Sequence, residues 1–169
     1  FLLTRGYSTF TAISVSLFMG LIFGAINGFV VGYLKVNSLI ATFATSVIAL
    51  GVNFWVGGGT TIMLFGDAAR EEFLAIGWQG YTLGIPVPAI IMLIVLVLGL
   101  MLTEKTPWGL RLYAVGGNPK AARLFGIKLE RMSLQAFMLS GLLAALSGIV
   151  VAARLGSGSP IAGQNYTQA

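Results

Sequence analysis

Ionised side chains are scarce in this sequence. Only 9% of the residues are charged and 57% are hydrophobic, whereas an ordinary soluble domain is about 25% charged. Four long stretches carry no charge at all: residues 6–34, 36–66, 73–103 and 132–153. A helix needs roughly 20 apolar residues to cross a bilayer, and one Arg or Asp at its centre costs about 2.5–3.5 kcal/mol. The four stretches therefore predict membrane-spanning helices, since too little polar sequence remains to cover them in a soluble protein.

Cysteine and histidine are absent altogether. Without cysteine the chain forms no disulfide and no thiolate metal site. Without histidine, and with Asp67 as its sole aspartate, the chain offers no ligand set for a metal and no base for histidine-dependent catalysis. The net charge of +5 does not indicate nucleic-acid binding, because the basic residues lie next to hydrophobic stretches, where they orient a membrane protein.

The expected fold class is all-α, a polytopic membrane helix bundle that forms one transmembrane domain over residues 1–169. We expect about four transmembrane helices, at approximately residues 11–34, 38–56, 85–103 and 132–153. Residues 57–84 and 104–131 form the two long connections. The chain begins at Phe1 rather than at Met and stops in a polar stretch, so we expect a fragment of a longer protein.

The distribution of Lys and Arg over the connections predicts the orientation in the membrane. The connection 104–131 carries six of them, which places it in the cytoplasm. Lys35 then also lies in the cytoplasm, whereas Arg5, Arg70 and Arg154 lie outside. The connection 57–84 is therefore the outer loop, in which we expect a short helix from Asp67 to about residue 76.

Small residues recur at every fourth position in the first and fourth spans. In the first span they are Gly20, Gly24, Gly28 and Gly32. In the fourth span they are Ser140, Ala144, Gly148 and Ala152. Four residues turn a helix by about 400°, so each set forms one stripe. Close backbone approach drives helix association in lipid, and we interpret both stripes as helix-packing surfaces.

A few polar side chains fall inside the first two spans. Asn27 lies beside the glycine stripe, and Thr42, Thr45 and Asn53 lie in the second span. A polar group without a partner is costly in hydrocarbon, so these residues should face protein or a water-filled path. They are our candidates for the path of a polar, uncharged solute, and interhelical hydrogen bonding is the alternative. No acidic residue lies inside a span, which argues against a proton- or sodium-driven carrier.

The inner connection contains the signature of a separate short helix. Asn118 followed by Pro119 is typical of an N-cap and the first helical position, and Gly126 is typical of the residue that ends a helix. Two turns are marginally stable alone in water, so this helix needs a partner surface. Ala121 and Ala122 would allow close docking, and Leu124 with Phe125 would supply apolar contact. The alternative is a basic loop that lies on anionic lipid headgroups.

Several segments carry a specific family resemblance. The first is the segment from Thr106 to Ile127, TPWGLRLYAVGGNPKAARLFGI, and others include SGLLAALSGI from Ser140 and NGFVV from Asn27. Together they resemble the bacterial ATP-binding-cassette (ABC) sugar permeases of the ribose, xylose and galactose type, within the branched-chain amino acid and sugar permease superfamily. The similarity covers most of the chain. It implies that the short helix couples the permease to an ATPase, and the residues concerned are Asn118, Pro119, Lys120, Ala121, Ala122, Arg123, Leu124 and Gly126.

The resemblance also implies a function and a set of partners. The chain would be a multi-pass permease subunit of the bacterial cytoplasmic membrane that imports a monosaccharide. A second permease subunit would complete the path, a cytoplasmic ATPase would bind ATP and Mg²⁺, and a periplasmic or lipoprotein sugar-binding protein would deliver the solute. The chain has no Gly-x4-Gly-Lys-Ser/Thr phosphate loop, so we expect no ATP hydrolysis by it. The alternatives are an ABC permease for branched-chain amino acids or nucleosides, and a secondary transporter.

Overall fold

The computed structural model describes residues 2–63, 68–79, 81–82 and 85–159. Four of its helices are long and apolar enough to cross a membrane: α1 (Thr9–Gly32), α2 (Ser38–Gly57), α4 (Val87–Lys105) and α7 (Leu129–Leu155). The remaining helical elements are the 3-10 turn Leu3–Arg5, α3 (Ala68–Leu74), the π-helical turn Ala75–Gln79, α5 (Pro107–Gly117) and α6 (Pro119–Leu124). The all-α bundle class predicted from the charge-free stretches is confirmed.

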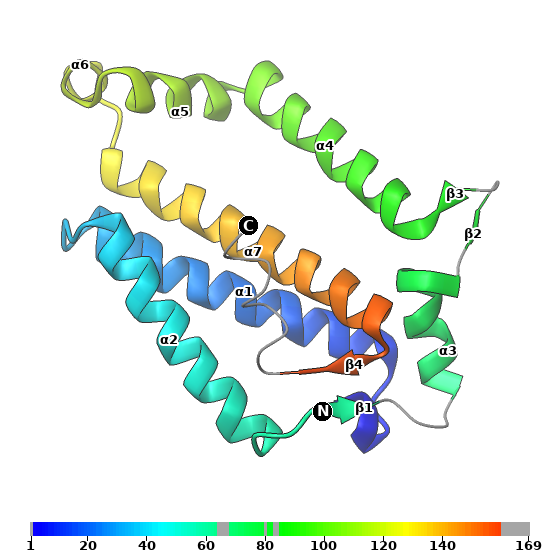
Figure 1. Cartoon of the computed structure of the whole chain (residues 1–169). Coiled ribbons are helices and arrows are strands. Elements are labelled where there is room, and N and C mark those ends of the chain that lie inside the picture. Colours follow the sequence, from blue (N-terminus) through cyan, green and yellow to red (C-terminus); the bar gives the residue numbers. More distant parts are fainter. Residues whose placement is uncertain (1, 64–67, 80, 83–84, 160–169) are drawn as a thin grey trace.

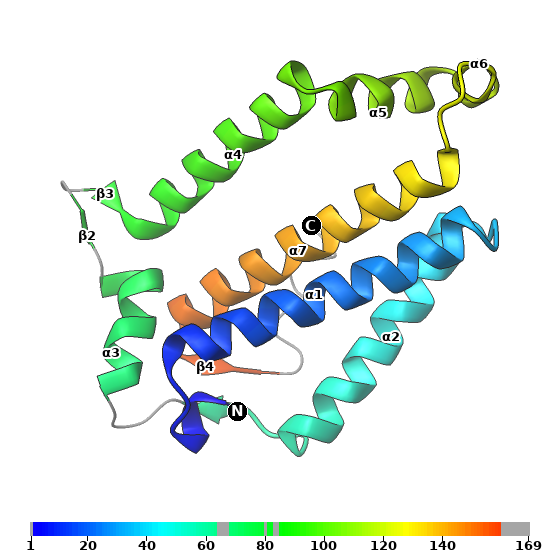
Figure 2. The same cartoon turned by 180° about the vertical axis from the view of Figure 1, so that it is seen from behind.

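Helices α1 and α7 lie side by side over most of their length and form the centre of the molecule (Figure 1). Helix α2 meets α1 at their short connection and diverges from it toward the other end. Helices α4 and α5 form an arm along the opposite side of α7, and the view from behind shows the same arrangement (Figure 2). Because α1 and α7 are the most closely packed pair, the interior of this fold is the interface between them.

Local sequence signals fix where the first two spans begin. The Ser8 side chain accepts a hydrogen bond from the Thr11 backbone N–H at 3.3 Å, which caps α1. The Asn37 side chain accepts one from the Leu39 N–H at 2.9 Å, which caps α2. Such side chains satisfy backbone donors that have no partner inside the helix.

The third span begins slightly later than expected. We placed its start at residue 85, with two prolines in the first turn. In the structure Ile85 and Pro86 form the short strand β3 (Ile85–Pro86), and Pro86 is the N-cap of α4 in an extended conformation. Only Pro88 lies in the first turn, where its missing N–H removes no helical hydrogen bond.

The outer connection contains more structure than the single helix predicted there. Helix α3 and the π-helical turn together cover most of the expected range, and its expected N-cap, Asp67, lies outside the described residues. Strand β1 (Ile62–Met63) pairs antiparallel with β4 (Ser157–Gly158), and β2 (Tyr81–Thr82) pairs antiparallel with β3. Two-residue strands carry no readable alternation of polar and apolar residues, which is why the sequence did not indicate them.

The two ends of the bundle differ in the connections that they carry. The turn between α1 and α2, which contains Lys35, lies at the same end as α6 and the start of α7 (Figure 1). Helix α3 and the two small strand pairs lie at the other end. The Lys/Arg-rich connection and Lys35 thus share one end of the molecule, as the predicted orientation requires.

Candidate functional site

Helix α6 has the ends that its sequence predicts. The Asn118 side chain accepts a hydrogen bond from the Ala121 N–H at 3.0 Å, and Pro119 occupies the first helical position. At the other end Gly126 has φ of 77°, a left-handed conformation that favours glycine. The Phe125 N–H donates to the Ala121 carbonyl at 3.2 Å and completes the last turn. Local chemistry alone therefore defines this short helix.

A second short helix, α5, was missed by the sequence analysis, which treated most of residues 104–131 as a loop. Its signal is the same as that of α6. Thr106 is the N-cap, its side chain accepts from the Gly109 N–H at 3.2 Å, and Pro107 follows at the first helical position. The junction with α4 is so tight that a Cβ at Gly109 would overlap the backbone of Thr103. Only glycine allows this sharp turn between the end of a span and a surface helix.

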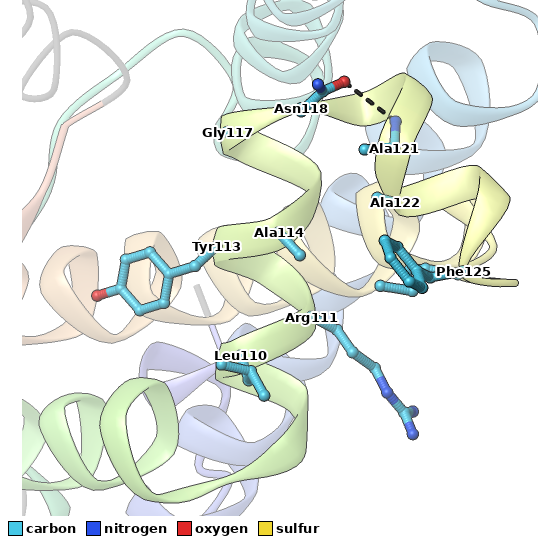
Figure 3. A pocket seen from close by; sticks show the side chains of 10 residues that line it. Leu110, Arg111, Tyr113, Ala114, Gly117, Asn118, Ala121, Ala122 and Phe125 are labelled. Atoms are coloured by element: carbon cyan, nitrogen blue, oxygen red, sulfur yellow. Dashed lines mark hydrogen bonds between the residues drawn. The ribbon is translucent and has the colours of Figure 1, made fainter.

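Helices α5 and α6 together form a pocket of about 490 Å³ (Figure 3). Ala114 of α5 and Ala122 of α6 lie on facing sides of this pocket, and the side chain of Arg111 extends away from it (Figure 3). Its lining residues are Leu110, Arg111, Tyr113, Ala114, Gly117, Asn118, Ala121, Ala122, Phe125 and Ile127. Most of this lining is apolar although the segment lies between two spans, at a polar end of the bundle.

The exposure of the α6 side chains corrects one detail of the predicted docking surface. Ala122 is only 3% exposed, so it packs within this unit, lines the pocket and adds little to the outer surface. Leu124 and Phe125 are 89% and 86% exposed, and Leu110 and Tyr113 of α5 are exposed as well. Large apolar side chains that gather on an exposed surface are typical of an interaction site.

Two side-chain contacts connect the α5–α6 unit to α7. The Arg123 guanidinium forms an ion pair with the Glu130 carboxylate at 3.0 Å, which joins α6 to the first turn of α7. The Trp108 indole N–H donates to the Gln135 side chain at 2.9 Å, which joins α5 to the same helix. The unit is thus attached to one particular span.

The glycine stripe of α1 lies directly against α7. A Cβ at Gly28 would lie 2.7 Å from the Leu134 Cα, closer than any ordinary contact between such atoms. Equally close approaches to α7 occur at Gly20, Gly24 and Gly32. The partner glycine on α7 is Gly141, where a Cβ would overlap the backbone of α1. The four glycines thus bring the two backbones into direct contact.

The stripe predicted on α7 does not face α1. Ser140 and Ala144 line a separate pocket, and a Cβ at Gly148 would meet no heavy atom within 4 Å among the described residues. The residues in contact with α1 are displaced from the predicted stripe by one position, at Gly141 and Ala145. One residue rotates a helix by about 100°, so a one-residue difference selects another face. A four-residue spacing identifies a stripe of small residues but not the neighbour that it faces.

The pocket that Ser140 lines has a volume of about 360 Å³ and lies among α1, α2 and α7. Three of the four predicted path residues, Asn27, Thr42 and Thr45, line it. The Thr45 hydroxyl lies 2.7 Å from the Asn27 side-chain oxygen, to which it donates a hydrogen bond. Asn53 is exposed on α2 and does not line this pocket. The structure thus gathers polar groups of two spans in one open pocket beside the α1–α7 interface.

Comparison with known proteins agrees with this architecture. A model of the family described as "branched-chain amino acid transport system / permease component" matches residues 1–168. The chain therefore belongs to this permease family and is an integral membrane protein. No solved structure matches it.

Similar individual proteins are named as sugar permeases. The chain is 40% identical to the ribose import permease protein RbsC of Haemophilus influenzae, over 93% of this chain and 48% of that protein. It is 36% identical to the L-arabinose transport system permease protein AraH of Escherichia coli, over 83% of this chain and 42% of that protein. It is 31% identical to the xylose transport system permease protein XylH of Haemophilus influenzae, over 95% of this chain and 58% of that protein. The chain thus spans about half the length of these relatives.

Proposed function

We propose that this chain is part of the transmembrane permease subunit of an ABC importer that carries a monosaccharide across the bacterial cytoplasmic membrane. Membership of the permease family supports the class of protein, and the ribose, arabinose and xylose permeases among its relatives support the class of solute. The observation that carries the proposal is the α5–α6 unit, a pair of short helices between two spans with exposed Leu124 and Phe125.

In this proposal the α5–α6 unit docks a cytoplasmic ATPase, which binds ATP and Mg²⁺ and supplies the energy. The contacts of Arg123 with Glu130 and of Trp108 with Gln135 would pass a displacement of the unit to α7. Helix α7 packs against α1 through glycines, so the two helices would move together. The pocket among α1, α2 and α7 lies beside this pair and is the proposed part of the solute path. A bundle with two packing arrangements would open this path to one side at a time.

The proposed transporter needs further components. A second permease subunit would complete the path, and a solute-binding protein on the outer side would deliver the sugar. The chain itself would hold no cofactor and perform no catalysis. Its role would be to bind, enclose and release the solute while the ATPase supplies the work.

The docking role is tested by introducing charge into the exposed apolar surface of α6. We expect Leu124→Asp or Phe125→Asp in the complete transporter to reduce both ATPase co-purification and solute uptake about tenfold or more, the loss typical of a central interface side chain. Tyr7→Asp is the matched control, because Tyr7 is a 51% exposed aromatic side chain at the other end of the molecule. Equal amounts of all variants in the membrane, measured by immunoblot, exclude a defect of insertion.

The results separate the alternatives. Full ATPase binding by Leu124→Asp and Phe125→Asp would show that this surface meets something else, such as lipid headgroups. The family description favours a second candidate function, the import of branched-chain amino acids. Competition between labelled ribose and unlabelled leucine distinguishes the two, since a sugar importer is blocked by ribose, xylose or arabinose and not by leucine.

A further inference from the structure

Polar side chains from three different helices meet in the pocket among α1, α2 and α7. Asn27 comes from α1, Thr42, Thr45 and Ser46 from α2, and Ser140 from α7. From the small-residue spacing we expected Ser140 to pack against another helix, but the face of α7 that packs against α1 is one residue away, at Gly141. Ser140 is exposed within this fold and lines the pocket together with residues of α1 and α2. Its position therefore calls for another explanation.

The hydroxyl groups of α2 already use their hydrogens. Thr42 donates to the Ser38 carbonyl at 2.8 Å, and Ser46 donates to the Phe43 carbonyl at 2.7 Å. The Thr45 hydroxyl lies between two acceptors, the Ala41 carbonyl at 2.8 Å and the Asn27 side-chain oxygen at 2.7 Å. A hydroxyl carries one hydrogen and two acceptor lone pairs. The α2 side of the pocket therefore presents oxygen atoms that can still accept hydrogen bonds.

The α1 and α7 sides present the complementary groups. Among the described residues, the Asn27 amide nitrogen and the Ser140 hydroxyl have no hydrogen-bond partner. An amide nitrogen has two hydrogens to donate, and a free hydroxyl can donate or accept. A polar group in this setting is costly without a partner. The lining of the pocket thus holds both unused donors, from α1 and α7, and unused acceptors, from α2.

None of the described residues that line the pocket is ionisable. A carboxylate or an ammonium group inside a membrane protein needs an opposite charge or several hydrogen bonds to offset the loss of its hydration. An amino acid would bring both groups into this pocket. A solute with several neutral hydroxyl groups, each able to donate and to accept, matches the lining without any charge. Two aromatic side chains, Phe23 and Phe137, add flat apolar surface beside these polar groups.

Building on the proposed function, we infer that Ser140 is a substrate-binding residue and that this pocket receives one face of an uncharged, polyhydroxylated solute. Ser140 and Asn27 donate hydrogen bonds to the solute, and the hydroxyl oxygens of Thr42 and Thr45 accept hydrogen bonds from it. The contacts come from three helices, so they form only when α1, α2 and α7 enclose the solute together.

The experiment compares Ser140→Ala with Ser147→Ala in the complete transporter, assembled with its ATPase and solute-binding protein. Ser147 lies on the same helix, donates to the Ala144 carbonyl at 2.9 Å and does not line the pocket. Maximal uptake rates are measured for ribose, xylose and arabinose, for their monodeoxy analogues, and for leucine. Each solute is supplied at a concentration that saturates the binding protein, so that the permease determines the difference between solutes.

We expect Ser140→Ala to lower the maximal rate for the transported sugar about three- to tenfold, the range for one hydrogen bond. The same variant should leave the rate for the monodeoxy analogue that lacks the contacted hydroxyl unchanged, because that analogue never made the bond. Ser147→Ala should change neither rate. Because Ser140 has no partner among the described residues, its replacement by alanine should not disturb assembly.

A Ser140→Ala variant that behaves like Ser147→Ala, or that slows the sugar and every analogue equally, would overturn the inference. Wild-type, ATP-dependent uptake of the sugar would leave the proposed function standing in that case. Uptake of leucine and of none of the sugars by the wild-type transporter would overturn both. Asn27→Ala with Asn53→Ala as its control repeats the comparison on the first two spans, since Asn53 lies outside the pocket.

Discussion

Replacing Gly141 by alanine tests how closely α1 and α7 pack. The new Cβ would lie 2.9 Å from the Gly24 Cα and would overlap the Gly20 carbonyl oxygen. Ordinary contact begins at 3.4 Å, and the Gly20 oxygen is the closer of the two atoms, so the two backbones must separate by roughly 1 Å at this point. The atoms that the Cβ meets belong to the backbone and cannot rotate away, as the end of a flexible side chain could.

The magnitude follows from two opposing effects. Overpacking of a closely packed interior typically costs about 1–3 kcal/mol. Alanine is also a better helix former than glycine, by up to about 1 kcal/mol. We therefore expect Gly141→Ala to lower the free energy of unfolding by about 1–2 kcal/mol. Gly148→Ala on the same helix is the control, since its Cβ meets no heavy atom within 4 Å among the described residues. That variant should be neutral or up to about 1 kcal/mol more stable.

The measurement is the equilibrium unfolding of the purified full-length permease in mixed micelles, titrated with SDS and followed by circular dichroism. Wild type and both variants are compared under one two-state analysis. Both variants gain the same helix propensity from alanine, so the difference in unfolding free energy between Gly141→Ala and Gly148→Ala reports the packing effect alone. If Gly141→Ala is as stable as Gly148→Ala, the two helices do not pack in the register described here.

The remaining predictions concern the ends and contacts of α6. Asn118→Ala removes the side chain that caps α6 and should cost about 1 kcal/mol, measured by the same SDS titration. Gly126→Ala should lower the free energy of unfolding by about the same amount, because Gly126 has φ of 77°, which alanine adopts poorly. Its control is Gly116→Ala, which should not destabilise the protein because Gly116 lies within α5 in open space. Arg123→Ala should lower the free energy of unfolding by less than about 1 kcal/mol, because Arg123 is 59% exposed and its ion pair with Glu130 is screened by water. A loss above about 2 kcal/mol in the same titration would show that this ion pair is more strongly stabilising than an exposed pair.

The spans were predictable because an ionised side chain is so costly in a bilayer that its absence marks the buried stretches. Their ends were less predictable, because charges are tolerated where a helix leaves the membrane. Helix α7 begins at Leu129, so Glu130 and Arg131 lie in its first turn, although both stand outside the charge-free stretch. Charged side chains at such a helix end reach the water at the interface.

Of the two short helices in the inner connection, only α6 was predicted from its local sequence signals. Helix α6 was predicted from Asn118 and Pro119, yet Thr106 and Pro107 form the same N-cap and first-position signal for α5. That signal was available in the sequence. The tight approach of Gly109 to Thr103, in contrast, depends on the angle between α4 and α5. No periodicity within either helix encodes this angle, so the junction needed the structure.

The assignment of residues to faces was the least predictable property of the site. Asn27 and Thr45 were candidates because they are polar, but the hydrogen bond between them depends on the angle at which α2 packs against α1. Asn53 is equally polar but lies about two turns beyond Thr45 on α2, in an exposed position. Ser140 fitted a small-residue stripe and instead lines the pocket. Composition identifies which residues need partners, whereas the packing angle of the helices decides which of them meet.

Helix α7 connects these observations because it contacts the α5–α6 unit, packs against α1 and lines the pocket. Its first turns bind the α5–α6 unit through Glu130 and Gln135. Its middle packs against α1 at Gly141 and, one residue away, presents Ser140 to the pocket. Helices in backbone contact cannot slide past each other without overlap, so in the proposed mechanism α7 would carry α1 with it. In the proposed mechanism, a displacement that begins at α6 would therefore reach two of the three walls of the pocket together, while α2 is joined to them by the hydrogen bond from Thr45 to Asn27.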